Sequence, residues 1–253
     1  MVRLSAVIIT FNEERNIGRC IDSLQGVADE IVVVDSNSTD ATQQICISKG
    51  ARFLLHAFEG YIEQKNFALE QATFNHILSL DADEALSDEL RQSILRVKTD
   101  WTADVYSMNR LTNYCGTWVR HGGWYPDRKV RLFRKESGRW GGINPHDEYR
   151  MIKGGKQSHL AGDLLHYSYY SSADHDRQID RFSAIGAKAL FEKGVRSNLL
   201  KMVYKPAARF IRNYLLKLGL LDGKTGWTIA RKSAKAVYWK YQRLYRLQKG
   251  RVL

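Results

Sequence analysis

The first hundred residues alternate between short apolar runs and amphipathic segments. Near-continuous apolar runs are typical of buried parallel strands, whereas apolar residues spaced three and four apart are typical of helices. The pattern predicts four strands, at Leu4–Thr10, Glu30–Asp35, Arg52–Leu55 and His76–Asp81. A helical pattern follows each strand, with Asn12 and Ser87 as caps of the first and fourth helices. Four βα units in succession predict an α/β fold, with a Rossmann-like, mostly parallel sheet and helices on both faces.

After residue 100 the alternation is less regular. The pattern predicts two strands, at 105–113 and 129–134. It then predicts a helix at 174–196 and one further helix on either side of residues 219–226. The last two helices are rich in Lys and Arg. We therefore predict a main domain of residues 1–198 and a basic helical extension of residues 199–253.

The composition is that of a globular protein. Of the 253 residues, 44% are hydrophobic and 26% are charged, which excludes a disordered chain. The three cysteines form no Cys-x-x-Cys pair, so we expect neither a disulfide framework nor a zinc site, and a reducing cytosol fits best. No apolar run approaches the ~18–20 residues of a membrane-spanning helix. The apolar N-terminus continues into FNEER, so we interpret it as a first strand and not as a signal peptide.

The net charge of +12 is concentrated near the C-terminus. Residues 1–198 contain 25 Lys and Arg against 26 Asp and Glu. Residues 199–253 contain 14 Lys and Arg and a single acid, Asp222. Such asymmetry indicates that the C-terminal segment meets a polyanion, either nucleic acid or an anionic membrane face.

The C-terminal segment also has helical periodicity. Apolar residues such as Val203, Ile211 and Leu215 recur on one helical face, and Lys205 and Arg209 belong to a separate basic stripe. Basic amphipathic helices with Tyr and Trp favour an anionic membrane surface. The alternative is that the apolar faces pack on the rest of the protein while the charges are solvated.

Acidic residues stand where the predicted strands end. Asp35 and Asp81 close two apolar strands, and Asp83 follows Asp81 by two residues. In an open α/β sheet, ligands bind at the carboxyl ends of the strands. Mg²⁺ and Mn²⁺ are held by one or two carboxylates together with phosphate oxygens. The pattern therefore favours a metal and nucleotide site, although a solvated acidic turn is the alternative.

Several segments together resemble family 2 glycosyltransferases, which have the GT-A fold. The matching segments are VIITFNEE, VVVDSNSTDAT, QKNFALEQA, ILSLDADE, KVRLFRK, NPHDE and LLHYSY, in this order. The order and spacing are most similar to the lipopolysaccharide-core β-1,4-glucosyltransferases. The resemblance covers residues 3–170 strongly and the C-terminal segment more loosely.

The resemblance implies a role for residues on the nucleotide side. Asp35 matches the acid that contacts a uracil-type base, and Asp81 matches the acid on the ribose side. Lys65 replaces an Arg that many relatives have near the base and diphosphate. The residues implied to bind the nucleotide are Thr10, Asn12, Glu13, Asp35, Lys65, Asp81 and Ala82.

The resemblance further implies a metal site and a general base. Asp83 matches the ligand of a Mg²⁺ or Mn²⁺ ion, and His166 matches a His that completes the site in some relatives. An inverting transfer needs one base on the acceptor side. The acids after the matching His are Asp147 and Glu148, of which Asp147 is the preferred candidate. Ion pairing of both acids with Arg150 is the structural alternative.

Other side chains are weaker candidates for the acceptor. Trp124 and Tyr125 offer aromatic faces on which a sugar can stack, although a local aromatic core is equally compatible with the pattern. The arginines of the strand predicted at 129–134 and its flank are candidates for phosphate contacts or for a solvated strand face, namely Arg128, Arg131 and Arg134.

The leading hypothesis is a metal-dependent inverting hexosyltransferase. Its predicted partners are a nucleotide-sugar donor, which we expect to be a UDP-sugar, a glycan or glycolipid acceptor of the lipopolysaccharide-core type, and an anionic membrane surface. We expect it in the cytoplasm, on the inner face of the cytoplasmic membrane, without a nucleic-acid partner. A nucleotidyltransferase is a second hypothesis, but TFNEE lacks the glycines of a phosphate loop. A non-catalytic RNA-binding protein is a third and leaves the acids at the strand ends unexplained. The sugar, the acceptor and the oligomeric state stay open.

Overall fold

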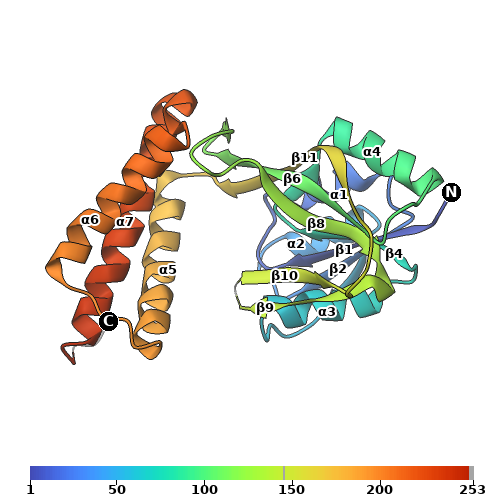
Figure 1. Cartoon of the computed structure of the whole chain (residues 1–253). Helices are drawn as coiled ribbons and strands as arrows, with labels where there is room; N and C mark the ends of the chain where they lie inside the picture. Colours follow the sequence, from blue (N-terminus) through green and yellow to red (C-terminus); the bar gives the residue numbers. More distant parts are fainter. Residues whose placement is uncertain (145, 251–253) are drawn as a thin grey trace. The chain divides into compact units, whose positions relative to one another are not determined.

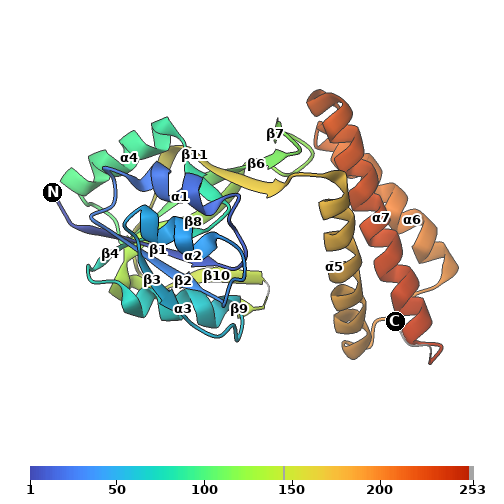
Figure 2. The same ribbon diagram turned by 180° about the vertical axis from the view of Figure 1, so that it is seen from behind.

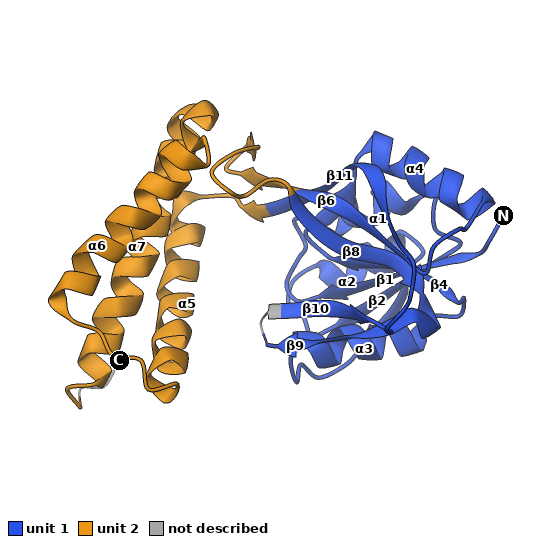
Figure 3. Cartoon of the chain, in the orientation of Figure 1, with its two compact units in different colours: residues 1–110, 127–167 blue, residues 111–126, 168–253 orange. Residues whose placement is uncertain are grey.

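The computed structural model describes residues 1–144 and 146–250, which form two compact units (Figure 3). The first comprises residues 1–110 and 127–167, and the second comprises residues 111–126 and 168–253. This division differs from the boundary predicted after residue 198. Helix α5 (Ser172–Glu192) lies before that boundary but is paired with α7 (Gly223–Leu247) by ion pairs, so it belongs to the same body as the C-terminal helices.

Four parallel strands form one half of the sheet in the first unit. Across the sheet they are β3 (Arg52–Leu55), β2 (Glu30–Asp35), β1 (Leu4–Thr10) and β4 (His76–Asp81). These are the bounds that the apolar runs predict. Thr10 of β1 lies opposite Asp35, and Ile9 lies opposite Asp81. The carboxyl ends of β1, β2 and β4 therefore meet at one edge of the sheet (Figure 1).

The other half of the sheet follows β4 and contains antiparallel pairs. Across the sheet come β8 (Asp127–Arg134), β6 (Val105–Tyr114), β11 (Gln157–Tyr169) and β5 (Glu84–Leu86), and β7 (Thr117–Val119) pairs with β6. β4 pairs with β8, β8 with β6, and β11 with β5 in the antiparallel sense. β6 and β8 agree with two predicted strands. β5 is only three residues long and too short to show a period of its own.

Helices cover both faces of the sheet, as predicted (Figure 2). Leu4, Ala6 and Ile8 of β1 pack under three helices, which are α1 (Ile17–Leu24), α2 (Thr42–Ser48) and α4 (Asp88–Thr99). The alternate residue Val7 faces α3 (Tyr61–Gln71) on the opposite side. A separate two-stranded sheet shares this second core, formed by β9 (Gly138–Ile143) after the short turn η1 (Lys135–Ser137) and by β10 (His146–Met151). The α/β class is thereby confirmed.

The second unit is built around three helices. α5 and α6 (Leu199–Ile211) both pack on α7, and the turns η2 (Arg212–Leu216) and η3 (Gly219–Asp222) connect α6 to α7. Lys232 and Lys235 of α7 hold Asp176 of α5, and their hydrogen bonds lower the pKa of Asp176 to about 2. The predicted C-terminal helices are confirmed. None of the helices in the described part of the chain is both long and apolar enough to cross a membrane.

Candidate active site

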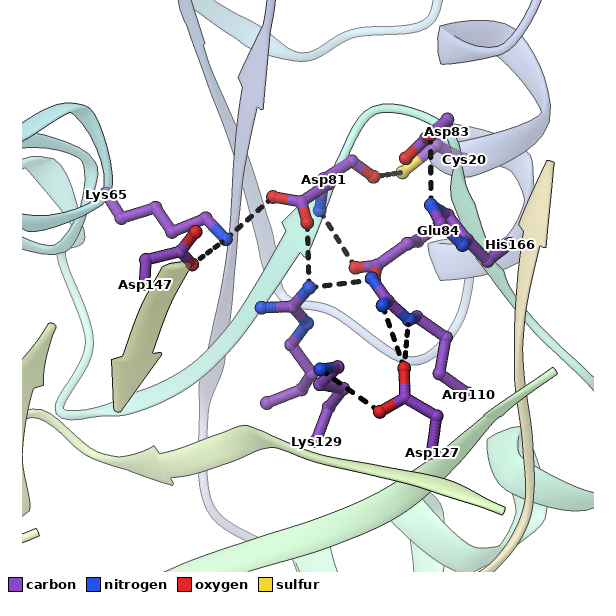
Figure 4. A network of polar contacts seen from close by, with 11 residues as sticks. Cys20, Lys65, Asp81, Asp83, Glu84, Arg110, Asp127, Lys129, Asp147 and His166 are labelled. Atoms are coloured by element: carbon purple, nitrogen blue, oxygen red, sulfur yellow. Dashed lines mark hydrogen bonds and ion pairs between the residues drawn. The ribbon is translucent and has the colours of Figure 1, made fainter. Parts of the chain in front are cut away.

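Asp81 ends β4, and its carboxylate is shared by two buried cations (Figure 4). Lys65 Nζ of α3 lies 2.9 Å from Oδ1, and Arg131 Nη2 of β8 lies 2.7 Å from Oδ2. The side chains of Lys65 and Arg131 are each 3% exposed. Burial alone would raise the pKa of Asp81, but these cations outweigh it and hold the pKa well below its usual range. Asp81 is therefore a fixed negative charge.

Glu84 extends this arrangement beneath Asp81. It is fully buried, lies 2.7 Å from Arg131 Nη2, and accepts a hydrogen bond from the Asp81 backbone N–H at 3.0 Å. Arg110 lies 3.6 Å from Glu84 and 2.8 Å from Asp127. Positive and negative groups thus alternate through the interior, which is the arrangement that a buried charge requires.

Arg131 and Glu84 are functional neighbours that the sequence interpretation missed. Arg131 was a candidate for phosphate contact or for a solvated strand face, but it is buried against Asp81 and Glu84. Alternation along the strand gave no signal for this, because the register of β8 on β6 shifts here: Leu132 lies opposite Tyr106, whereas Val130 lies opposite Ser107.

Lys65 links Asp81 to a second acid, Asp147 of β10. Its Nζ lies 2.7 Å from Asp147 Oδ2, and the Trp140 ring centroid lies 4.5 Å from the same ammonium group. A buried ammonium group loses its hydration, and two carboxylates with an aromatic face replace it. Two elements far apart in sequence, the strand end at residue 81 and the β9–β10 pair, are thereby joined.

The two neighbours of Lys65 in the QKN segment also hold structure in place. Gln64 bonds to Ser36 and to His56, and Asn66 bonds to both the backbone N–H and the carbonyl of Trp140. The helix thereby fixes β9 while it directs Lys65 into the site. The polar triplet at the centre of an otherwise amphipathic helix was the signal for these contacts, and only Lys65 was singled out from the sequence.

The alternation of side chains along β10 separates the two candidate bases. Asp147 faces Lys65 and its side chain is 15% exposed. Glu148 is 63% exposed and pairs with Arg150 at 2.9 Å. Tyr149, on the same side as Asp147, stacks on Phe133 with ring centroids 3.9 Å apart. This packing fixes which of the two acids faces inward.

Asp83 and His166 meet because β5 pairs with β11. His166 lies opposite Glu84 in the antiparallel register, and its Nε2 lies 3.1 Å from Asp83 Oδ2. Burial raises the pKa of Asp83, but the nearby His166 outweighs this effect, and the net pKa is lowered. A carboxylate and an imidazole are ligands that suit Mn²⁺ and, through the carboxylate, Mg²⁺.

The pair fits a metal that takes its other ligands from a substrate. Within residues 1–144 and 146–250, no group of three or more His, Cys, Asp or Glu side chains is arranged to hold a metal ion. Two protein ligands are sufficient when phosphate oxygens and water supply the rest, as is common for Mg²⁺. The donor set therefore agrees with a metal bound together with a diphosphate.

The loop after β1 is braced against the loop after β2. Asn12 was predicted to cap the first helix, but that helix begins at Ile17, and Asn12 has a positive φ of 52°. Its Oδ1 accepts a hydrogen bond from the Thr39 N–H at 2.8 Å. Asp35 is fully buried, and both its oxygens accept hydrogen bonds from Ser38. The partner of Asp35 in this structure is thus the Ser36–Asp40 loop.

The remaining candidates of the nucleotide side lie at the same edge. Thr10 is buried, and its Oγ1 has no hydrogen-bond partner in the described part of the chain. The buried Ala82 donates its N–H to the carbonyl of Ile9 at 3.2 Å. Burial raises the pKa of Glu13 to about 7, and Asn16 donates a hydrogen bond to its carboxylate. These residues surround the ends of β1 and β4.

A polar cavity of about 570 Å³ opens beside this network. Its wall is formed by Lys65, Asp81, Arg110, Arg128, Lys129, Val130, Arg131, Trp140, Asp147, Glu148 and Tyr149, so both candidate bases border it. The site therefore combines fixed negative charges with a surplus of cations around one space, an arrangement suited to a substrate that carries phosphate.

Trp124 and Tyr125, the candidates for the acceptor, belong to the second unit. Trp124 packs in an aromatic cluster with Tyr114, Tyr169 and His175, at ring-centroid distances of 5.9–6.0 Å. Tyr125 lies beside Arg120, whose guanidinium carbon is 5.7 Å from the ring centroid. For Trp124, the local aromatic core is what the structure shows.

Residues 5–162 match the sequence model of the family described as Glycosyl transferase family 2. The lipopolysaccharide core biosynthesis glycosyltransferase LpsC of Rhizobium meliloti is 32% identical over 259 residues, which cover 94% of this chain and 93% of LpsC. The uncharacterized glycosyltransferase RT0209 of Rickettsia typhi is 28% identical, over all of this chain and 88% of that relative.

Two solved structures are similar at lower identity. S. aureus TarS 1-349 in complex with UDP is 16% identical over 98% of this chain and 92% of that chain, with a TM-score of 0.48. Glucosyl-3-phosphoglycerate synthase from Mycobacterium tuberculosis in complex with Mg²⁺ and UDP is 22% identical, with a TM-score of 0.38. The match covers 44% of each chain, so this chain spans less than half of the synthase.

Replacing Arg131 tests the buried charge network. Arg131→Met leaves Glu84 buried without its closest cation, so the free energy of unfolding should fall by about 3–5 kcal/mol. Urea unfolding measures the change. Arg134→Met on the same strand is the matched control, because Arg134 is 38% exposed and pairs with Asp104 only at 3.7 Å. Its loss should cost less than about 1 kcal/mol. Equal losses in the two variants would contradict the network.

Proposed function

The chain belongs to glycosyl transferase family 2, and we propose that it transfers a sugar from a UDP-sugar to a glycan or glycolipid acceptor with inversion at the anomeric carbon. One observation carries the proposal. Lys65 connects Asp81, at the strand edge where α/β sheets bind nucleotides, to Asp147, the candidate base, beside a single polar cavity. The proposed donor side, at Asp81, and the proposed acceptor side, at Asp147, therefore lie next to each other.

The nucleotide is proposed to bind across the ends of β1, β2 and β4. Asp81 is ionised and fixed, which suits an acceptor of hydrogen bonds from ribose hydroxyls. The unsatisfied Thr10 Oγ1 supports a polar ligand at the same edge, because buried hydroxyls are normally paired. Asp35 is proposed to act on the base side, either directly or by holding the Ser36–Asp40 loop against the nucleotide.

Asp83 and His166 are the residues that would hold Mg²⁺ or Mn²⁺. When bound, such an ion supplies charge neutralisation for the departing diphosphate. Lys65 and the cations of the cavity add positive charge on the same side. Asp81 keeps the ammonium group of Lys65 oriented, so Asp81 supports the binding of the diphosphate by positioning Lys65.

The proposed reaction needs one proton transfer and one displacement. Asp147 accepts the proton of the acceptor hydroxyl while that oxygen forms a bond to the anomeric carbon. The bond from the anomeric carbon to the diphosphate oxygen breaks on the opposite face, and its electron pair leaves with UDP. Attack opposite to the leaving group inverts the configuration. The inward position of Asp147 and the outward position of Glu148 support the choice of base.

The acceptor is proposed to be a lipopolysaccharide-core-like glycolipid. The 32% identity to LpsC over nearly the whole of both chains supports an envelope polysaccharide as the product. A glycolipid acceptor would be met at a membrane, and we propose the inner face of the cytoplasmic membrane as the place of action.

Thermal unfolding with nucleotides tests the donor and the metal. UDP at about 100 times its dissociation constant should stabilise the folded protein by ~2.7 kcal/mol, and the gain should depend on Mn²⁺. Asp83→Asn should lose the part that depends on Mn²⁺. Asp88→Asn, an exposed acid in the first turn of α4, is the matched control and should behave as wild type. No stabilisation by any nucleoside diphosphate, with or without the metal, would contradict the proposed function.

Separate substitution of Asp147 and of its neighbour Glu148 tests which acid is the general base. Asp147→Asn should lower the turnover of the most stabilising UDP-sugar by about 10²–10⁴-fold, with little change in UDP affinity, because the base acts on the acceptor hydroxyl. Glu148→Gln is the matched control and should keep most of the activity. Rate of UDP release and calorimetric UDP affinity are the two measurements. An inactive Glu148→Gln beside an active Asp147→Asn would reverse the assignment.

A further inference from the structure

Helix α6 and the turns after it present apolar side chains that are largely or half exposed in the described part of the chain. We define the α6 apolar face by the exposed side chains of Leu200, Val203, Tyr204, Ile211, Leu215 and Leu218. The four members within α6 recur at helical spacing, and Leu215 and Leu218 follow in η2 and in the turn after it. Val203 is 70% exposed and Leu200 69%, values far from those of a buried helix face. An apolar surface of this kind indicates a binding partner.

Towards its C-terminal end the same helical stretch packs on α7. Phe210 and Tyr214 contact Trp227 of α7, with ring centroids 5.0 and 5.3 Å apart. Asn213 is buried there. The sequence periodicity showed the apolar residues of α6 but not which of them stay exposed. The packing of the bundle uses Phe210 and Tyr214 and leaves the side chains of the α6 apolar face exposed.

The charges around this face have one sign. Residues 193–221 contain seven Lys and Arg and no Asp or Glu. Lys205, Arg209 and Arg212 lie on a different side of the helix, are exposed, and have no ion pair within residues 1–144 and 146–250. Three cations of α7 differ, because Lys232 and Lys235 are bound to Asp176 and Arg243 is bound to Asp180. Positive charge that is not engaged by an acid therefore borders the α6 apolar face.

We propose that the α6 apolar face inserts into the surface of a bilayer that contains anionic lipids. Apolar side chains on one helix side and cations on an adjacent side are the arrangement of helices that lie in the membrane interface. A second copy of this chain would bring the same seven cations against the face. A nucleic acid would pair with the cations and leave the leucines in water. This proposal goes beyond the proposed reaction and selects α6, not both C-terminal helices, as the contact.

Vesicle co-sedimentation of the full chain tests the apolar half of the proposal. The vesicles consist of phosphatidylcholine alone or mixed with phosphatidylglycerol. The triple variant Leu200→Gln, Val203→Gln and Ile211→Gln should bind the mixed vesicles at least about tenfold more weakly than wild type. Phe182→Gln with Ile185→Gln, exposed apolar residues of α5, is the matched control and should bind as wild type.

A second set of variants tests the charges. Each cation near an anionic surface changes the affinity by about fivefold, so Lys205→Gln, Arg209→Gln and Arg212→Gln together should weaken binding by about 100-fold. The matched control removes three exposed cations of α7 and of the residues after it, as Arg231→Gln, Arg246→Gln and Lys249→Gln. A smaller loss is expected there. Equal losses of vesicle binding in the two variants would indicate a general attraction of all surface cations to the membrane, and would overturn the proposal.

Two further readouts separate the possible failures. Melting temperature and UDP affinity should match wild type in every variant, so lost vesicle binding is distinguished from misfolding and from a failure of the proposed function. Sedimentation velocity without lipid should show one species. The membrane assignment would be overturned if the wild-type protein did not bind vesicles that contain phosphatidylglycerol. It would also be overturned if the wild-type protein formed a dimer that the triple variant of Leu200, Val203 and Ile211 abolished.

Discussion

The site depends on the sharing of one buried ammonium group by two carboxylates. Lys65 is almost fully buried, and its charge is stable there only because Asp81 and Asp147 lie 2.9 and 2.7 Å away. Asp81 belongs to the parallel sheet, whereas Asp147 belongs to the separate β9–β10 pair. The lysine therefore sets how closely the acceptor-side strand approaches the strand edge that is proposed to bind the donor.

The surrounding residues hold Lys65 and its two carboxylates in place. Asn66 bonds both backbone groups of Trp140, so α3 carries Lys65 and β9 together. Arg131 and Glu84 supply the further charges that leave Asp81 ionised. Removal of any single member leaves its partners buried with one opposite charge fewer, which destabilises the fold. Strand alternation then gives Asp147 and Glu148 different surroundings although they are adjacent in sequence.

The sequence predicts the parts of this arrangement that are local. The strands that end at Asp35 and Asp81 are continuous apolar runs, and the carboxyl-edge rule then places their acids together. The pairing of Arg131 with Glu84 was not predictable, because the two residues are 47 positions apart and belong to strands that do not pair with each other. Asn12 was wrong as a helix cap, since its side chain instead bonds Thr39 of another loop. In α6, periodicity identifies apolar positions, but only the packing of Trp227 shows which of them stay exposed.

The central claim is that Lys65 and Asp147 are energetically coupled, and a double-mutant cycle on the free energy of unfolding measures this directly. The variants are Lys65→Met, Asp147→Asn and the double variant, each unfolded in urea. A buried pair at 2.7 Å predicts a coupling energy of about 1–3 kcal/mol, with the double variant less destabilised than the sum of the two single variants. Additivity within about 0.5 kcal/mol would contradict the account, because the two residues would then be independent.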